Sequence, residues 1–362
     1  MAQLPHHAMS TGLVSRVPRT TLDWLLSEEN PAVGALTRRE LFGDEPSPEL
    51  DALWARRNEY PPVARILELM ADDGTWAPPP RDYAKYGGSL WQIHFLGELY
   101  ANGDDERVRR AAEYALSRQL PDGSWSCSNA RAHGSIPCLT ANVGRALARL
   151  GYARDERVIA ALGHCVALYR ELGVIGCREL LGYQLNGYCH MLTPKLLLFL
   201  AEVPHDVWPD GAEELREKCI ARLREKGVFR SLPAEAKEYQ DAVAKMPAAE
   251  RLAYRESFLT EHPTLHHKEK AGWLRFGYPL SYNSDILEAL WALALHGEEM
   301  RKEYAEAFAI VRDAGGEEMR WKLRTSFNGK MLADVEVRGQ PSRWLTLRAL
   351  LVMQHFSEAS PA

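Results

Sequence analysis

The sequence predicts an all-α fold built from repeated pairs of helices, and three observations predict it. Mostly apolar helical stretches alternate with charged amphipathic ones from residue 61 to residue 352. The string "GDDERVRRAAEY" near residue 103 returns about 50 residues later as "ARDERVIAALGH" near residue 153, a period typical of repeat architectures. No strand-like alternation of useful length occurs. We therefore expect an inner ring of helices covered on most sides and an outer ring that is amphipathic.

The chain divides into an N-terminal part and a long repetitive part. Residues 1–56 predict a helical extension, and residues 57–362 predict a single ring domain with an insertion at about 231–272, where Glu, Lys and Ala interrupt the rhythm. The helices expected in the inner ring cover residues 90–100, 137–147, 189–200, 282–293 and 341–352. The amphipathic helices expected outside begin near residues 61, 104, 155, 211 and 298.

The turn between two predicted helices carries the most informative motif. Gln119, Gly123 and Trp125 form the pattern Q-x-x-x-G-x-W at the end of an amphipathic helix. Glycine allows a positive φ in the turn, the Gln amide can bond backbone groups left unpaired at a helix end, and the Trp can bury a large apolar area. A degraded copy ends at Trp76, with Met70 in the position of the Gln.

This motif resembles the QW repeat of squalene–hopene cyclases and their relatives, which form α/α toroids. Further pieces look like an uncharacterised bacterial family described as squalene-cyclase-like or prenyltransferase-like, within the terpene cyclase and protein prenyltransferase superfamily. They include Trp91-Gln92, Cys138 to Asn142, Cys189 to Met191 and Gly339 to Leu347. The resemblance implies one α/α toroid, an incomplete α6/α6-type barrel of five or six helix pairs.

The resemblance also implies a terpene-cyclase-like enzyme, a cyclase or isomerase acting on an isoprenoid or other apolar substrate in a central cavity. The chain departs from the family in its acid motif, because no D-x-D-D occurs and the comparable helix begins Tyr282-Asn-Ser-Asp285. A carboxyl group buried in such a cavity would have a raised pKa and could act as a general acid. The candidate catalytic residues are therefore Asp285, Glu336 and His190.

Aromatic side chains on or near the predicted inner elements would line that cavity, since aromatic faces attract cations and also form apolar pockets. Arg343 could meet an anionic group such as a diphosphate, or it could bridge a helix end. The candidate substrate-binding residues are Trp91, Tyr188, Trp273, Tyr282, Trp291, Trp344 and Arg343.

A zinc site is a second hypothesis. Cys138, the pair Cys189-His190 and Asp285 begin predicted inner helices, and thiolate, imidazole and carboxylate are zinc ligands. The arrangement resembles the protein farnesyltransferase β-subunit and the lanthionine cyclases, which implies Cys177, Cys189 and His190 as ligands with Asp285 or Cys138 as the fourth. Buried cysteines and a satisfied core histidine are the alternative.

Composition narrows the partners. The net charge is −5 and no basic patch or tail indicates nucleic acid. No apolar run approaches a membrane span, no signal peptide is evident, and six cysteines in a chain of this length do not indicate a disulfide framework. A cytoplasmic protein is expected, with peripheral membrane contact left open.

Two other functions stay open: a zinc-thiolate enzyme acting on a thiol or peptide, and a non-catalytic toroid that binds a lipid or protein.

Overall fold

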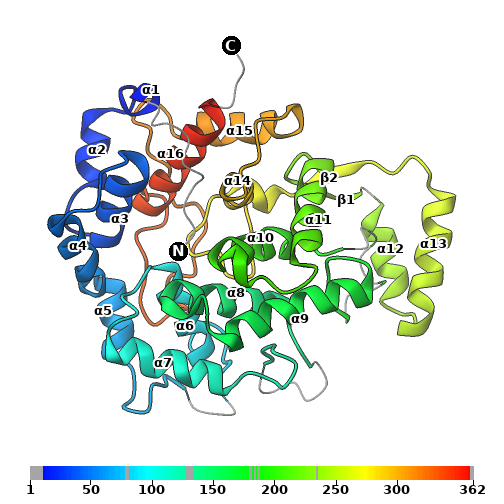
Figure 1. Ribbon diagram of the computed structural model, residues 1–362. Helices are drawn as coiled ribbons and strands as arrows, with labels where there is room; N and C mark the ends of the chain where they lie inside the picture. The colour runs from blue at the N-terminus through cyan, green and yellow to red at the C-terminus, as the bar shows by residue number, and fades with distance from the viewer. Residues whose placement is uncertain are drawn as a thin grey trace.

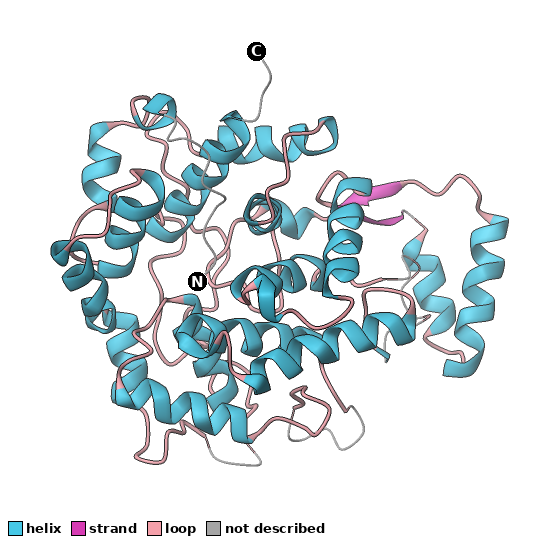
Figure 2. Cartoon of the chain, in the orientation of Figure 1, coloured by secondary structure: helices cyan, strands magenta, loops and turns pink. Residues whose placement is uncertain are grey.

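Helices account for nearly all the regular structure in this computed structural model, which describes residues 11–77, 81–127, 134–178, 182, 185, 188–233 and 235–358 (Figures 1 and 2). The first ten residues of the predicted extension and the last four of the chain lie outside the described residues. No helix within these ranges is long and apolar enough to span a membrane.

The inner helices follow one another around a ring. Neighbours in contact are α6 with α8, α8 with α10, α10 with α14, α14 with α16, and α16 with α3. The inner helices are almost wholly buried, as the apolar sequence stretches predicted. Their bounds are α3 (Pro31–Leu36), α6 (Ser89–Glu98), α8 (Pro137–Leu147), α10 (Leu192–Glu202), α14 (Ile286–Leu295) and α16 (Arg343–Glu358).

The amphipathic helices form the outer layer and alternate with the inner ones along the chain (Figure 1). Most pack against the inner helix beside them in sequence, as α7 does with α6 and α9 with α8, whereas α2 packs against α16. The outer helices are α2 (Arg19–Leu25), α5 (Pro61–Glu68), α7 (Glu106–Ser117), α9 (Glu156–Leu172), α11 (Ala212–Glu225) and α15 (Lys302–Ala314), with the short α1 (Thr11–Val14) and α4 (Pro48–Ala55) in the N-terminal part. The predicted ring of helix pairs is confirmed.

Tryptophan turns fix the pairs in register. The indole of Trp125 donates from Nε1 to Ala115 O (2.7 Å), and its backbone N–H donates to Thr140 Oγ1 on the next inner helix (3.1 Å). The same two bonds recur at Trp76, to Ile66 O and Ser89 Oγ, and at Trp321, to Val311 O and Thr346 Oγ1. Each Trp therefore ties the end of an outer helix to the start of an inner one.

Gln119 and Gly123 behave as the motif predicts. Gln119 Nε2 donates to Gly123 O and to Arg157 O, both at 2.7 Å, and so joins the turn to the first turn of α9. Gly123 has φ +85, and a Cβ there would lie 2.6 Å from Ala160 O. Sequence reading missed the Trp321 turn, because Gly315 occupies the Gln position and only the Trp with its preceding glycines marks the copy.

Between α11 and α14 the chain leaves the ring. It runs through β1 (Arg230–Pro233), α12 (Ala236–Val243), α13 (Arg251–Glu261) and β2 (His267–Glu269), and the two strands pair antiparallel with Arg230 opposite Glu269. The two helices lie away from the ring in Figure 1 and share a small core of their own, which includes Tyr239 and Phe258. The strands bring the chain back to the rim at the start of α14.

Candidate functional site

The interior of the ring is crossed by the chain itself, in the segment that precedes α14. The Ser281 hydroxyl shares a hydrogen bond with Nε2 of His94 in α6 (3.0 Å). The Ser281 carbonyl accepts a hydrogen bond from Asn142 Nδ2 of α8 (3.1 Å). In the same segment Tyr278 bonds the carbonyl of Glu98 and stacks on Trp344 of α16 (5.0 Å between ring centroids). Residues 277–285 therefore occupy the space that the sequence analysis assigned to a central cavity.

Charged side chains join neighbouring inner helices around this segment. Arg145 of α8 lies 2.6 Å from Glu98 of α6, and Lys195 of α10 lies 2.5 Å from Glu288 of α14, with all four side chains at most 6% exposed. Burial acts to raise the pKa of Glu98, but Arg145 and Arg149 outweigh it and hold that pKa below its ordinary value. These pairs, which were not predicted, make the centre of the ring polar and closed by ion pairs.

A cavity of about 760 Å³ opens at the rim where α10 and α14 begin, and we call it the rim pocket. Its size is that of a small-molecule site. Part of its lining is apolar, with the side chains of Asn283, Ser284 and Thr325 beside it. The charged part of its lining comes from β2 and the loop that follows. The residues are Met191, Leu232, Lys268, Glu269, Lys270, Ala271, Gly272, Trp273, Arg275, Leu280, Asn283, Ser284 and Thr325.

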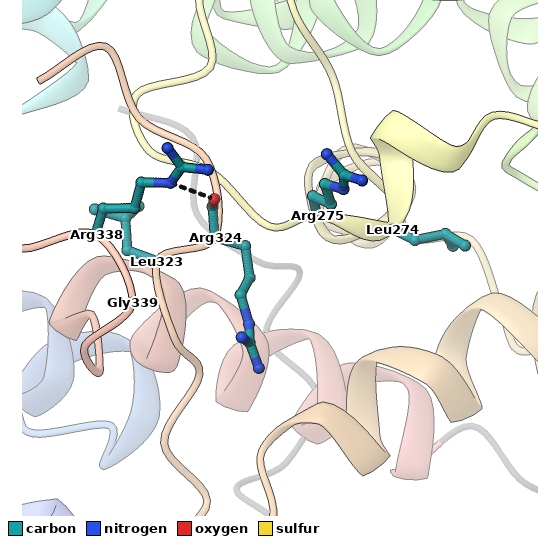
Figure 3. A pocket seen from close by; sticks show the side chains of 6 residues that line it. All are labelled: Leu274, Arg275, Leu323, Arg324, Arg338 and Gly339. Carbon is teal, nitrogen blue, oxygen red and sulfur yellow. Dashed lines mark hydrogen bonds between the residues drawn. The ribbon is translucent and has the colours of Figure 1, made fainter.

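Arg275 also lines a second cavity of about 520 Å³ together with Leu274, Leu323, Arg324, Arg338 and Gly339. Arg338 Nε donates to the carbonyl of Arg324 (3.2 Å). Figure 3 shows the guanidinium groups of Arg338 and Arg275 pointing the same way, while the side chain of Arg324 extends in the other direction. We call this cavity the arginine pocket.

The two pockets hold cations without matching carboxylates. None of Lys268, Lys270, Arg275, Arg324 and Arg338 makes an ion pair within the described part of the chain, and the one acid of the lining, Glu269, lies 3.7 Å from Arg230. Burial lowers the pKa of Lys270, and the nearby Cys189 partly offsets this. A chain of net charge −5 thus has a locally positive rim suited to an anionic group.

Trp273 lines the rim pocket, and His190 packs against it. Their rings stack at 4.3 Å with 20° between planes, and both side chains are buried. His190 Nε2 donates to Val228 O (2.9 Å), and burial lowers the pKa of His190 to about 3. His190 is therefore neutral at physiological pH, which suits a packing role beside Trp273 better than proton transfer.

Asp285 lies next to the rim pocket but caps α14. Its Oδ1 accepts from Glu288 N (2.8 Å) and its Oδ2 from Gly277 N (3.0 Å), and the side chain is buried. Burial, with Glu288 nearby, raises the pKa of Asp285 to about 7. Its neighbour Ser284 lines the pocket and donates to Met191 O (3.1 Å). The cap that the sequence left as an alternative is present, and a catalytic role for Asp285 stays a prediction.

Glu336 and Arg343 stabilise the start of α16 and do not line the rim pocket or the arginine pocket. Glu336 Oε1 accepts from Arg343 N (2.7 Å), and burial raises the pKa of Glu336. The Arg343 guanidinium bonds Glu29 (2.6 Å), Ser27 and Trp24 O. The structure thus gives Arg343 a bracing contact with the N-terminal helices, and its role in binding an anionic ligand stays a prediction.

The remaining predicted aromatic residues fall into separate clusters. Trp91 meets Tyr282 edge to face (5.1 Å), and Tyr282 bonds Tyr83 through the two hydroxyls (2.9 Å). Trp344 stacks on Tyr100 and, with Trp291, lines a separate small cavity of about 30 Å³. Arg222 lies over Tyr188. Of the predicted binding residues, only Trp273 lines the rim pocket.

The proposed zinc ligands do not converge. In the described residues no three His, Cys, Asp or Glu side chains are placed to share a metal ion, and both carboxyl oxygens of Asp285 already accept backbone N–H groups. Cys138 and Cys189 lie at the starts of the neighbouring inner helices α8 and α10, which pack against each other. Zinc at Cys177, Cys189 and His190, with Asp285 or Cys138 as the fourth ligand, stays a prediction that elemental analysis of the purified protein would test.

Comparison with known proteins gives limited guidance. No protein-family model matches the chain, and no curated protein matches it. Among solved structures, variants of the type II terpene cyclase MstE from Scytonema are similar. One in complex with geranylgeranyl dihydroxybenzoate is 13% identical over 85% of this chain and 98% of its own, with a TM-score of 0.33. Another, with merosterolic acid A, is 14% identical over 83% and 96%, also at 0.33. At that TM-score the likeness carries no argument about family or chemistry.

Sequence reasoning missed the wall of the rim pocket. The sequence analysis placed Trp273 among the binding residues but gave no role to Lys270 and Arg275, which flank it. A buried tryptophan between spaced cations, just ahead of an inner helix, was the available signal. It could be recognised only with the knowledge that β1 and β2 return this segment to the rim.

Proposed function

We propose that this chain is a terpene-cyclase-like enzyme whose substrate is an amphipathic isoprenoid bound at the rim pocket, with its anionic end toward the cations. The observation that carries the proposal is the make-up of this one cavity. Trp273, Met191 and Leu280 offer apolar surface, while Lys270 and Arg275 offer unpaired positive charge at its edge. A tail and a charged end would each meet matching surface.

The reaction would need a proton donor at the floor of the pocket. Asp285 is the candidate, since it follows the pocket residue Ser284 and its pKa of about 7 leaves a protonated fraction at neutral pH. Because both of its oxygens hold backbone N–H groups, the segment before α14 would have to shift for the proton to reach a substrate. Cyclisation or isomerisation of an alkene is the reaction class that such an acid supports.

The test uses farnesyl diphosphate and farnesol as probes of the purified full chain. Binding is followed by tryptophan fluorescence and products by mass spectrometry of an organic extract. We expect saturable binding of farnesyl diphosphate that weakens in Trp273→Ala, with Trp344→Phe, in a different cavity, as the control. Asp285→Asn should bind farnesyl diphosphate normally but form no product.

Three outcomes would contradict this function in different ways. Saturable binding with no product from any isoprenoid would favour the non-catalytic lipid-binding alternative. Binding unaffected by Trp273→Ala would remove the rim pocket as the site. Product formation that persists in Asp285→Asn would remove Asp285 as the acid while leaving the pocket in place.

A further inference from the structure

The side chains of three arginines and two glutamates are buried together among the inner helices. Arg145 pairs with Glu98 (2.6 Å), and Arg149 pairs with Glu202 (2.5 Å). The third arginine, Arg348 of α16, is 7% exposed and makes no ion pair within the described residues. The cluster therefore holds one positive charge more than its two carboxylates neutralise.

Arg348 lines the small cavity of about 30 Å³, which lies where the first and last inner helices meet. The lining includes Leu36 of α3 and Glu40 of the helical turn that follows, Thr37–Leu41. Trp344 and Arg348 come from α16, which packs against both α3 and this turn. We call this space the closure cavity, because it lies at the contact that closes the ring.

The lining of the closure cavity does not neutralise Arg348. Glu40 supplies its carboxylate, which already accepts a hydrogen bond from Arg39 Nε (2.7 Å). The guanidinium of Arg348 lies over the ring of Tyr278 (5.1 Å), which attracts a cation but leaves its charge in place. The indole N–H of Trp344 is buried and has no acceptor at hydrogen-bond geometry within the described residues. A buried cation and a buried donor both lack a partner, which is costly unless an anion supplies one.

We propose that the closure cavity binds a monovalent inorganic anion, chloride being the abundant candidate, beside Arg348. A cavity of about 30 Å³ has room for one or two water-sized particles and none for an organic ligand. The apolar part of its lining, such as Leu36 and Trp291, would leave the oxygens of a phosphate without donors. Water alone would fill the space but leave the excess positive charge.

The anion would link folding to its own concentration. The cavity exists only when α16 lies against α3 and the turn after it, so the unfolded chain offers no such site. A ligand that binds only the native state stabilises it in proportion to 1 + [anion]/Kd. The closure cavity is separate from the rim pocket, and the proposal does not depend on what the rim pocket binds.

The experiment measures urea unfolding of the full chain while sodium chloride replaces sodium gluconate at fixed ionic strength. Gluconate is too large for the cavity, and urea brings no anion of its own. We expect chloride to stabilise wild type, with the unfolding equilibrium constant falling about tenfold for each tenfold rise in chloride above the Kd. Bromide should act in the same way.

Arg348→Met separates the site from general effects of salt. In gluconate this variant should be at least as stable as wild type, because it removes a buried charge that has no partner. In chloride it should gain nothing. Arg338→Met is the matched control, since Arg338 also makes no ion pair in the described residues but is exposed, and it should keep the full response to chloride.

A crystal structure of wild type grown in sodium bromide gives a readout that does not require any variant to fold. We expect an anomalous peak for bromide in the closure cavity beside Arg348. A cavity without bromide, or a response to chloride that persists in Arg348→Met, would overturn the proposal. It would also be overturned if Arg348→Met were equally destabilised in gluconate and in chloride, because Arg348 would then be neutralised by the protein itself.

Discussion

The centre of the ring and its rim both hold many charged side chains, but they use them differently. In the centre, Arg145 with Glu98 and Lys195 with Glu288 are buried and paired at 2.5 to 2.6 Å. At the rim, Lys270 and Arg275 face a cavity with no ion-pair partner in the described residues. A charge that is already neutralised by a neighbour joins helices, whereas a charge left open at a cavity is available to a ligand.

The largest effect should come from breaking a central pair. Arg145→Met removes the cation closest to the buried Glu98 and leaves Arg149 at 3.7 Å, so the free energy of unfolding should fall by about 3–5 kcal/mol. Denaturant unfolding measures it. Arg154→Ala is the control, because Arg154 and Asp206 form an exposed pair worth less than about 1 kcal/mol. Equal effects of the two substitutions would show that burial does not distinguish them.

Asp285 should make stability depend on pH in the opposite sense to an ordinary ion-paired carboxylate. Its pKa of about 7 in the native state lies above the ordinary value of 3.8, so between these values the native state holds a proton that the unfolded state releases. Unfolding free energy should therefore fall as the pH rises through this window, by at most about 1.4 kcal/mol per pH unit.

The measurement compares wild type with Asp285→Asn, which cannot titrate, so that other groups cancel in the difference. The difference should change between about pH 4 and pH 7 and be flat outside that range. A difference that stays constant across the window would mean that Asp285 is ionised throughout and is a cap alone.

Salt should affect ligand binding at the rim more than it affects the stability that the central ion pair provides. Raising ionic strength from about 0.1 M to about 1 M shortens the screening length from about 10 Å to about 3 Å, so binding of farnesyl diphosphate at the exposed rim cations should weaken. Unfolding of wild type relative to Arg145→Met should hardly change, since the central pair is shielded from solvent. Binding that is indifferent to salt would argue against a role for the rim cations.

The smallest expected effect is an increase in stability. Met70 stands where Gln119 stands in the complete motif, and Gly74 approaches the backbone of Arg110 as Gly123 approaches that of Ala160. Met70→Gln should therefore add the bonds that Gln119 makes and raise the unfolding free energy by about 1 kcal/mol. Gln119→Met should lower it by a similar amount, and both are read from denaturant unfolding. No gain from Met70→Gln would mean that the two turns differ more than their backbones indicate.

The ring could be predicted from sequence because its signals are local. Helical periodicity, the 50-residue repeat and the turn from Gln119 to Trp125 each lie within a short stretch. The candidate site could not be predicted from sequence, because it depends on contacts between segments that are far apart in the chain. Ser281 reaches α6 and α8 from the far side of the ring, and Arg343 binds Glu29 some three hundred residues away.

The cysteines show which features of the rim could be predicted from helix positions alone. Cys138 and Cys189 stand 51 residues apart, one repeat period, at the starts of two neighbouring inner helices. Their place at the starts of neighbouring inner helices could be predicted because it follows from the helix pattern alone, whereas the packing of α8 against α10 could not. Asp285 was placed at the same rim, but its bond to Gly277 N turns its carboxyl group inward.

The central claim is that the open charges of the rim, and not the paired charges of the centre, recognise a ligand. The most direct test is calorimetric binding of farnesyl diphosphate and farnesol to wild type and to the double variant Lys270→Ala with Arg275→Ala. We expect wild type to prefer the diphosphate, and the double variant to lose at least about tenfold in diphosphate affinity, at the low end for lost charged hydrogen bonds, while farnesol affinity stays the same. Equal weakening for both ligands, or none for either, would contradict the claim.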